Sequence, residues 1–298
     1  MTAQSQPFAP DGPALSADDF ANIARFISNE AGLCLPETNQ PLVYSRLVRH
    51  VHRLGCADFS QYLKAVHADD SGQERETLIQ ALTTNTTRFF REPAHFDILA
   101  RDLLPELVAR ARKGGRVRIW SAGCSTGEEA YCIAAVVLSQ FPEVERSDLR
   151  ILGTDINHSV LERAKKGEYS SNHIAGIPDA YVDQMFEPAD GATEVRSIRP
   201  ALKNMISFRY LNLIAPWPVR GPFDAIFCRN VAIYMDQPTQ HKLWAGFERV
   251  LSPNGMLFIG HSERLGPEMS QRFRPTGQTA FCRVPSPGHQ LQGETHVS

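Results

Sequence analysis

Residues 117–129 combine a glycine turn with an acidic helix start, a pattern that could bind a charged cofactor. An apolar run ends at Ala122, three residues separate Gly123 from Gly127, and Glu128 and Glu129 follow at once. In a G-x-G-x-x-G loop the glycines let the backbone approach a pyrophosphate. Two carboxylates would instead repel a diphosphate and suit a ligand that carries amino and sulfonium cations. The pattern favours S-adenosylmethionine, and its structural alternative is an ordinary strand-to-helix turn.

Polar residues also follow the later apolar runs. Asp155 comes after residues 149–154, where a carboxylate can accept hydrogen bonds from both ribose hydroxyls of an adenosyl ligand. Because Asp is also a favoured N-cap residue, a helix cap is the alternative. Two further runs would bring five more residues to the same edge: Asn212, Leu213, Arg229, Asn230 and Tyr234. The asparagines could instead satisfy turn backbone, and the tyrosine could belong to the core with its hydroxyl at the rim.

Residues 83–92 are dense in hydroxyl groups and place Arg88 and Arg91 around an aromatic pair. The structural alternative is a polar hinge that caps a helix starting near Pro93, a residue suited to a first helical turn. The functional interpretation is that the segment folds over the cofactor edge. Arg91 would then supply a planar, permanently charged fork for a carboxylate.

The elements that position these residues alternate between strands and helices from Arg116 onward. The apolar patterns predict strands at Val117 to Ser121, Leu149 to Thr154, Met205 to Asn212, Phe223 to Cys228 and Met256 to Gly260. The helices between them are predicted at Glu128 to Gln140, His158 to Lys166 and Thr239 to Val250, the last closed by Pro253-Asn254-Gly255. This alternation predicts an α/β fold with a doubly wound sheet.

The residues before this region predict a small all-helical domain over residues 16–85. Ser16 can cap a first helix that ends at Gly32, and a second is predicted from Gln40 to Leu54. Two more helical patterns run from Phe59 to Val66 and from Glu76 to Leu82. One side of the second helix carries Arg46, Arg49 and Arg53, which could meet an acidic partner or could simply be a solvated face.

The remaining segments complete the predicted organisation. We expect a flexible arm over residues 1–15, a linker and helix over 86–114, a second domain over 115–284 and a flexible tail over 285–298. Residues 167–204 are long for a crossover and contain an alternating stretch from Glu194 to Ile198. They predict an inserted β-subdomain beside the sheet.

Composition excludes several classes of protein. The chain has 298 residues, 42% of them hydrophobic, and a formal charge of -2, so it can bury real cores but lacks the basic footprint of a nucleic-acid binder. Its first residues resemble no export signal, and the longest apolar run, Tyr131 to Leu138, is too short to span a bilayer. The six cysteines have no C-x-x-C pairing, so we expect reduced thiols in the cytosol and no metal site.

Four motifs together make the chain resemble the CheR-type chemotaxis receptor glutamate O-methyltransferases. They are T-N-x-T-x-F-F-R-E at residues 84–92, S-x-G-E-E at 125–129, F-D-x-I-F-C-R-N at 223–230 and G-H-S-E at 260–263. The resemblance covers residues 17–283. It implies a class I S-adenosylmethionine-dependent methyltransferase domain, Rossmann-like, with a helical N-terminal domain and an inserted β-subdomain.

The resemblance also implies which residues act. The cofactor S-adenosylmethionine would be contacted by Asn85, Thr87, Arg91, Glu129, Asp155, Asn212, Leu213, Arg229 and Asn230. The glycine turn itself adds Gly123, whose backbone would approach the cofactor. Arg91 and Tyr234 would be the catalytic residues nearest the transferring methyl group. Arg46, Arg49 and Arg53 would meet acidic receptor helices.

The expected activity is methylation of receptor glutamates to γ-methyl esters, with S-adenosylhomocysteine as the second product. We expect a cytoplasmic monomer that acts on the cytoplasmic helical domain of chemotaxis receptors and is recruited to membrane receptor clusters without entering the membrane or binding nucleic acid. The loop from Glu187 to Val195 lacks the paired glycines of relatives that grip a receptor's C-terminal pentapeptide, so that tether is not predicted. The alternatives are a nucleic-acid methyltransferase of the same fold and a noncatalytic receptor adapter that senses S-adenosylmethionine.

Overall fold

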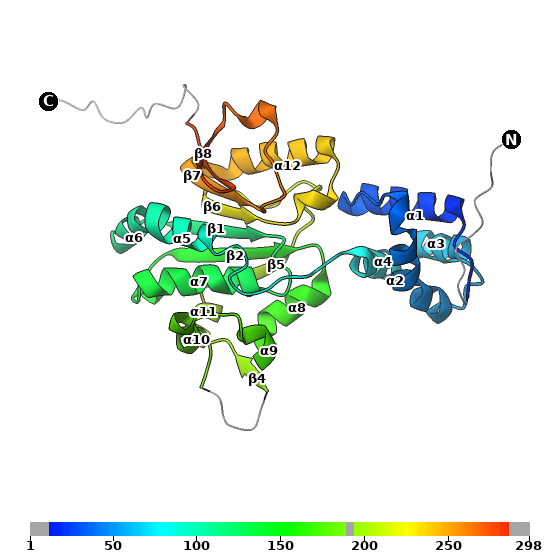
Figure 1. The fold of residues 1–298 in the computed structure, drawn as a ribbon, viewed down its shortest axis with the longest axis horizontal. Coiled ribbons are helices and arrows are strands. Elements are labelled where there is room, and N and C mark those ends of the chain that lie inside the picture. Colours follow the sequence, from blue (N-terminus) through cyan, green and yellow to red (C-terminus); the bar gives the residue numbers. More distant parts are fainter. Residues whose placement is uncertain (1–11, 189–193, 286–298) are drawn as a thin grey trace.

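The computed structural model describes residues 12–188 and 194–285. A helical N-terminal unit lies beside a larger α/β unit, and residues 83–93 cross from one to the other (Figure 1). The N-terminal helices are α1 (Ala17–Ala31), α2 (Gln40–Arg53), α3 (Phe59–Ala68) and α4 (Gln73–Leu82), with a 3-10 turn at Glu37–Asn39. Their apolar faces form a core of their own.

The first helix begins and ends where the sequence predicts. The Ser16 hydroxyl accepts from the Asp19 N–H while the Asp19 carboxylate accepts from the Ser16 N–H, and Gly32 ends the helix in the left-handed conformation. The flexible arm expected over residues 1–15 is wrong at its end, because Leu15 is fully buried in the same core as Phe20. Leu15 precedes the cap, the position from which a hydrophobic staple contacts the first turn. Residues 1–11 lie outside the described part, as do 286–298 of the expected tail.

A seven-stranded sheet forms the centre of the α/β unit, in the order β5-β2-β1-β6-β7-β9-β8. The first five strands in this order pair in parallel, and β9 and β8 add an antiparallel edge. The strands are β1 (Val117–Ala122), β2 (Leu149–Asp155), β5 (Ile206–Tyr210), β6 (Phe223–Cys228), β7 (Leu251–Ile259), β8 (Phe273–Gly277) and β9 (Ala280–Arg283).

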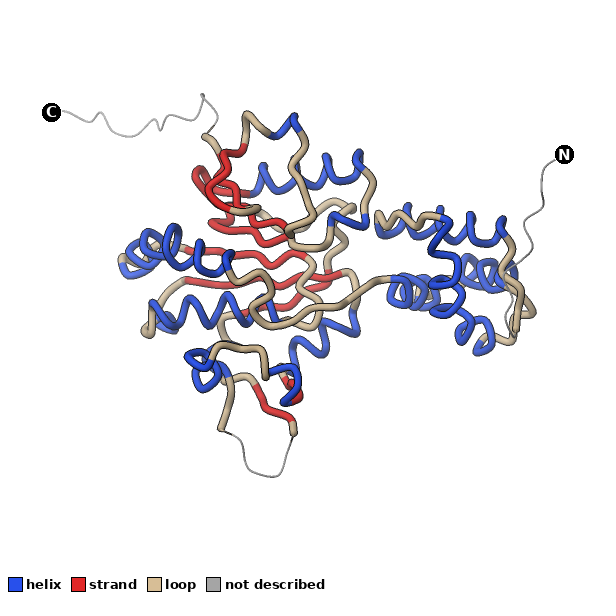
Figure 2. The backbone as a smooth tube through the Cα atoms, viewed as in Figure 1, coloured by secondary structure: helices blue, strands red, loops and turns tan. Residues whose placement is uncertain are grey.

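Helices cover both faces of the sheet, so the predicted doubly wound fold is confirmed (Figure 2). Successive residues of β1 serve opposite faces: Ile119 packs in one core with α7, and Trp120 packs in the other with α12. The helices of this unit are α5 (Ala94–Ile98), α6 (Leu104–Arg112), α7 (Glu128–Gln140), α8 (His158–Lys166) and α12 (Gln237–Val250). A π-helical turn at Leu99–Leu103 joins α5 to α6, and 3-10 turns occupy Val144–Arg146, Ala232–Tyr234 and Pro267–Met269.

Two details at the end of the sheet correct the prediction. Residues 253–255 do not close α12, which ends at Val250, but lie inside β7 at an irregularity in its pairing with β6. The antiparallel strands β8 and β9 were not predicted. They are short and β8 contains Pro275, which weakens a strand signal because Pro cannot donate to a ladder.

The expected insertion contains an antiparallel pair, β3 (Glu168–Ser170) with β4 (Val195–Ser197). It also contains short helices that the sequence pattern does not predict, α9 (Ser171–Ile174), α10 (Asp179–Met185) and α11 (Pro200–Lys203). Figure 1 shows it below α7, and residues 189–193, in the loop expected to lack a receptor-tether site, lie outside the described part. Across the described ranges no helix is long and apolar enough to cross a membrane.

Candidate active site

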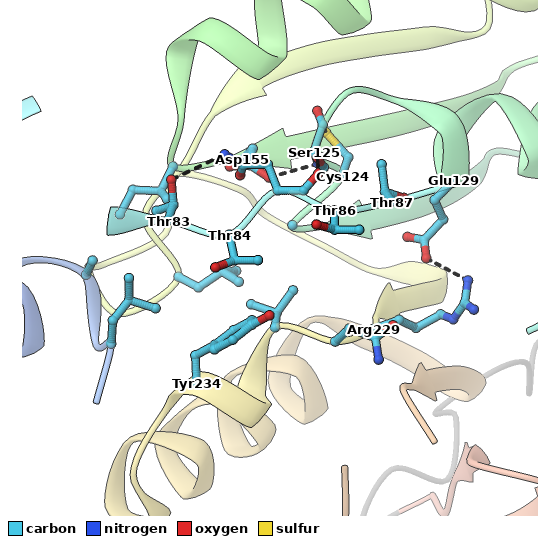
Figure 3. A pocket seen from close by; sticks show the side chains of 18 of the residues that line it. Thr83, Thr84, Thr86, Thr87, Cys124, Ser125, Glu129, Asp155, Arg229 and Tyr234 are labelled. Carbon is cyan, nitrogen blue, oxygen red and sulfur yellow. Dashed lines mark hydrogen bonds and ion pairs between the residues drawn. The ribbon is translucent and has the colours of Figure 1, made fainter. Parts of the chain in front are cut away.

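One pocket opens at the carboxyl ends of β1, β2, β5 and β6, where ligands bind in doubly wound folds (Figure 3). Every cofactor-binding and catalytic residue named from the sequence lines it: Asn85, Thr87, Arg91, Gly123, Glu129, Asp155, Asn212, Leu213, Arg229, Asn230 and Tyr234. These residues come from five separate stretches of the chain, so their convergence is a property of the fold rather than of local sequence.

The glycine turn is shaped by close packing behind the pocket wall. Gly123 has a φ of 82°, and a Cβ there would lie 2.4 Å from Cγ2 of Val231 in the loop after β6. The N–H groups of Gly123 and Cys124 both donate to the Thr154 carbonyl at 2.8 Å. Only glycine meets both demands at position 123, because it tolerates positive φ and has no side chain.

Asp155 closes β2 and supports the same turn. Its Oδ2 accepts from the Ser125 N–H at 2.8 Å and its Oδ1 from the Asn157 N–H at 3.0 Å. The cap of α8 is Asn157, whose side chain accepts from the Ser159 and Val160 N–H groups, so the helix-cap alternative for Asp155 is wrong. Burial raises the pKa of the Asp155 carboxyl, against the opposing effect of its backbone hydrogen bonds.

The two carboxylates at the start of α7 have different environments. Glu128 is buried away from the pocket, where both its oxygens accept from the Thr126 hydroxyl, at 2.9 and 2.6 Å. Glu129 lines the pocket, accepting from the Ser121 hydroxyl at 2.6 Å and from Nη1 of Arg229 at 3.0 Å. The acidic helix start therefore presents one carboxylate to a ligand rather than the expected two.

Residues 83–91 fold over the pocket as a strap. The Asn85 carbonyl accepts from the Ser125 hydroxyl at 2.8 Å, and the Thr83 hydroxyl accepts from the Asn157 amide at 3.2 Å. Figure 3 shows Thr84, Thr86 and Thr87 facing the glycine turn and Tyr234 across the cavity. The strap is thus a wall of the site, as its functional interpretation requires.

Arg91 and Arg229 are linked in the deeper part of this wall. Nη1 of Arg91 donates to the Thr86 carbonyl at 3.2 Å, and Nη2 of Arg229 donates to the Arg91 carbonyl. The Arg229 side chain is 2% exposed and is ion-paired with Glu129 and Glu92. Arg91 is therefore the more accessible of the two guanidinium groups, and Arg229 is held inside its network.

The N-terminal helical unit contributes to the pocket, which the sequence did not reveal. Ala31 and Leu33 line it, the Cys34 N–H donates to the Tyr234 carbonyl at 2.7 Å, and the Asn212 amide donates to the Glu30 carbonyl at 2.7 Å. The Asn212 oxygen accepts from the Ile214 N–H at 3.1 Å, which is the turn-satisfying role named as its alternative. Tyr234 is 36% exposed, so it is a rim residue rather than a core residue.

The loop after β6 depends on a buried acid that was not among the predicted site residues. Glu263 accepts from the backbone N–H groups of Asn230, Val231 and Gly260, at 3.0, 2.9 and 2.5 Å. Asn230 has a φ of 59°, an uncommon conformation for a residue with a side chain. Glu263 belongs to the G-H-S-E motif, which was the available signal for this supporting role.

Two of the three arginines on α2 are engaged within the chain, which corrects the expected free cationic face. Arg46 donates to the Leu82 and Thr83 carbonyls at 2.9 and 3.1 Å. Arg53 forms a two-pronged ion pair with Glu74. Arg49 is exposed and its Nε lies 3.1 Å from a ring nitrogen of His50, so it alone of the three has no bond to a carboxylate or carbonyl in the described structure.

Several lining residues were not predicted, and some of them shape the chemistry. They are Ala31, Leu33, Thr83, Thr84, Thr86, Arg88, Phe96, Cys124, Ser125, Ile156, Leu211, Val231 and Met235. Arg88 adds an exposed cation to the pocket, and the apolar members supply walls for an adenine-sized group. From the sequence, Arg88 was identified only as a neighbour of the aromatic pair, and its place in the pocket was not predicted.

The residues present fit S-adenosylmethionine. The carboxylates of Glu129 and Asp155 are separate acceptors for an ammonium group and for ribose hydroxyls, and Gly123 adds no side chain to the turn between them. Arg91 supplies a cation for a carboxylate, and the ring of Tyr234 can lie beside a sulfonium. A dinucleotide would instead bring a pyrophosphate against Glu129.

Comparison with known proteins agrees with this fit. Residues 18–83 match the CheR methyltransferase all-alpha domain, and residues 85–282 match the CheR methyltransferase SAM binding domain. A probable chemotaxis protein methyltransferase of Rhizobium etli is 43% identical over 256 residues, covering 86% of this chain and 96% of that protein. The chemotaxis protein methyltransferase of Escherichia coli K12 is 39% identical, covering 90% and 92%. Chemotaxis protein methyltransferase 2 of Pseudomonas aeruginosa is 36% identical, covering 89% and 92%. The chain belongs to the CheR methyltransferase family.

Proposed function

We propose that this protein methylates glutamate side chains of chemotaxis receptors, giving glutamate γ-methyl esters and S-adenosylhomocysteine. Its relatives are named chemotaxis protein methyltransferases, and glutamate is the acceptor that the resemblance to the family implies. The acceptor is the cytoplasmic helical domain of a receptor. The enzyme acts as a cytoplasmic monomer recruited to receptor clusters, with a helical domain ending near residue 85 and a catalytic domain over residues 115–284.

The observation that carries the proposal is the composition of one pocket. Glu129 and Asp155 provide anionic groups for the cofactor, while Arg91 and Tyr234 lie in the same cavity. A carboxylate acceptor needs a cation to hold it and needs no general base to activate it, and this pocket has that arrangement.

S-Adenosylmethionine supplies a methyl group on a sulfonium sulfur, and the acceptor carboxylate oxygen takes that methyl as the carbon–sulfur bond breaks. Within the chain, Asp155 would hold the ribose, Glu129 the amino group, and Asn85, Thr87, Asn212 and Asn230 the remaining polar groups. Leu213 would contact the adenine, and Gly123 would let the backbone approach.

The chain's own residues act by positioning. A glutamate carboxyl has a reference pKa of about 4.3 and is almost fully ionised at neutral pH, so no general base is required. The Arg91 guanidinium would fix one carboxylate oxygen and leave the other free to react, which lowers the entropic barrier to approach. The Tyr234 ring would pack beside the sulfonium. Exposed Arg49 on α2 would contact acidic receptor helices.

The deciding experiment uses S-adenosylmethionine with a tritiated methyl group, the purified protein and membranes that contain chemotaxis receptors. Base-labile label on the receptor, released as methanol, is the expected result. The matched control is a receptor in which the labelled glutamates, mapped by mass spectrometry, are changed to alanine.

Two outcomes would overturn the proposal. Tight cofactor binding without transfer to any receptor would favour a noncatalytic adapter. Base-stable label on RNA or DNA, with salt-sensitive binding, would favour a nucleic-acid methyltransferase.

A further inference from the structure

A charge cluster centred on buried Arg229 lies in the wall of the pocket and extends beyond it. Its Nη1 is 3.0 Å from Oε2 of Glu129, and its Nη2 is 3.4 Å from Oε2 of Glu92. The guanidinium lies 5.7 Å from the centre of the Phe96 ring. Since Glu129 lines the pocket and Glu92 does not, Arg229 connects the ligand-facing carboxylate to one outside the cavity.

This cluster carries two carboxylates for one guanidinium. Burial disfavours the charged form of Glu92, but Arg229 and a hydrogen bond from His261 outweigh it, so the pKa of Glu92 lies below its usual value. His95, 3.6 Å from Oε2 of Glu92, adds no charge at neutral pH because burial and Arg229 lower its pKa to about 4. Exposed His261 contacts the outer oxygen, Oε1, at 3.1 Å. Arg229, Glu129 and Glu92 together therefore have a net charge of -1.

The same cluster holds the backbone on which Arg91 is mounted. Phe90 and Glu92, on either side of Arg91, have φ values of 49° and 54°, and such conformations persist only where the surroundings hold them. The Phe90 N–H donates to Sγ of Cys132 at 3.1 Å, and Arg229 donates to the Arg91 carbonyl. Glu92 therefore affects the position of Arg91 in two ways. It follows Arg91 in the chain, and it is ion-paired with Arg229, which donates to the Arg91 carbonyl.

We infer that Glu92 is a positioning residue of the methyl-transfer site. It holds Arg229 against the Arg91 carbonyl. Because Arg229 is shared between Glu92 and Glu129, it does not fully neutralise the negative charge of Glu129. S-Adenosylmethionine carries one more positive charge than S-adenosylhomocysteine, so this residual charge favours the substrate over the product. The inference rests on the proposed function, because only a methyl transferase must exchange these two ligands.

The test compares the wild-type protein with Glu92→Gln, which keeps the size of the side chain and an acceptor oxygen but removes its charge. Calorimetric titration should show the Kd of S-adenosylmethionine rising about 10-fold and that of S-adenosylhomocysteine about 3-fold, since a lost charge acts more strongly on the more cationic ligand. The matched control is Glu268→Gln, because Glu268 also pairs with a histidine, His241, at 2.9 Å but lies at the surface. This control should leave both constants unchanged.

A merely structural role for Glu92 would weaken both ligands equally, so an unchanged ratio of the two constants would overturn the inference. If Glu92→Gln does not fold, Glu92→Asp decides, because it keeps the charge on a shorter arm. That variant should have a turnover about 10-fold lower, because Arg91 is displaced. The ratio of its Kd values for the two ligands should stay within about 2-fold of wild type, because the charge is kept. A larger change in this ratio would count against the charge effect. These titrations need no receptor, so failure of receptor methylation in the wild-type protein rejects the proposed function separately.

Discussion

Arg88 and Arg91 of the pocket differ from two of the three arginines of α2 in how the fold uses their charge. In the pocket, Arg91 keeps an accessible guanidinium, and exposed Arg88 makes no hydrogen bond or ion pair within residues 12–188 and 194–285. On α2, Arg46 is fixed on the end of α4 and Arg53 on Glu74. The spacing of arginines in the sequence predicts which face of a helix they occupy. Whether its charge remains available depends on the partners that tertiary structure brings to it.

The largest effect should come from the accessible pocket arginine. Replacing Arg91 with Ala should lower kcat for receptor methylation by about 100- to 1000-fold, because a preorganised charged donor at the reacting group is lost. Arg91→Lys should recover only part of this rate, since an ammonium lacks the planar fork. The measurement is initial-rate methylation at saturating cofactor, after circular dichroism has shown that each variant is folded.

A matched control for Arg91→Ala is Arg112→Ala, since Arg112 is exposed and paired with Glu143 away from the pocket. It should keep wild-type rates. A wild-type rate for Arg91→Ala would show that Arg91 does not hold the acceptor carboxylate.

A smaller effect, on stability, should follow from changing Arg46. Its guanidinium satisfies two carbonyls at the end of α4 and the Thr84 hydroxyl. Arg46→Ala should lower the free energy of unfolding by about 2 kcal/mol, the usual value for hydrogen bonds to a charged group. Urea denaturation measures this change, and cofactor affinity should fall with it because Thr83 and Thr84 line the pocket. Unchanged stability with weakened receptor binding would assign Arg46 to the acceptor surface instead.

The sequence predicted the parts of this molecule that rest on local periodicity. The strand β6 and the helices α7 and α8 have the predicted bounds, because apolar spacing and caps are written in consecutive residues. Topology then brings strand ends to one edge, which is why the sequence alone assigns Asp155, Asn212 and Arg229 to one site.

The parts that the sequence did not predict depend on contacts between distant residues. Glu128 and Glu129 are adjacent and chemically identical, yet only the fold sends one to Thr126 and the other to the pocket. Leu15 was assigned to a loose arm because the first residues are rich in Pro, Gln, Ala and Ser, but it is buried in the core of the N-terminal helices. The G-H-S-E motif was a signal for Glu263, but its bonds to Asn230 and Val231 join residues more than thirty positions apart. No local pattern could reveal those partners.

Arg88, which makes no hydrogen bond or ion pair in the described part of the chain, should affect acceptor binding rather than turnover. Arg88→Ala should raise the KM for receptor about 5-fold with kcat unchanged, since an exposed charge acts mainly on encounter with an acidic partner. The rise should shrink as salt is increased. Comparing the KM of both proteins at two salt concentrations measures this. A fall in kcat instead would place Arg88 among the groups that touch the reacting carboxylate.

The smallest effect should come from Arg53, and it tests the α2 side of the comparison directly. Its pair with Glu74 lies at the surface, with the arginine side chain 47% exposed, and such pairs contribute about 0.2–1 kcal/mol. A double-mutant cycle of Arg53→Ala and Glu74→Ala should give a coupling energy in that range, with receptor KM unchanged. If Arg53 serves the receptor instead, Glu74→Ala would release its guanidinium and lower the receptor KM, and adding Arg53→Ala would reverse the gain. The sign of the Glu74→Ala effect on KM therefore decides whether α2 holds its charges for the fold or for the acceptor.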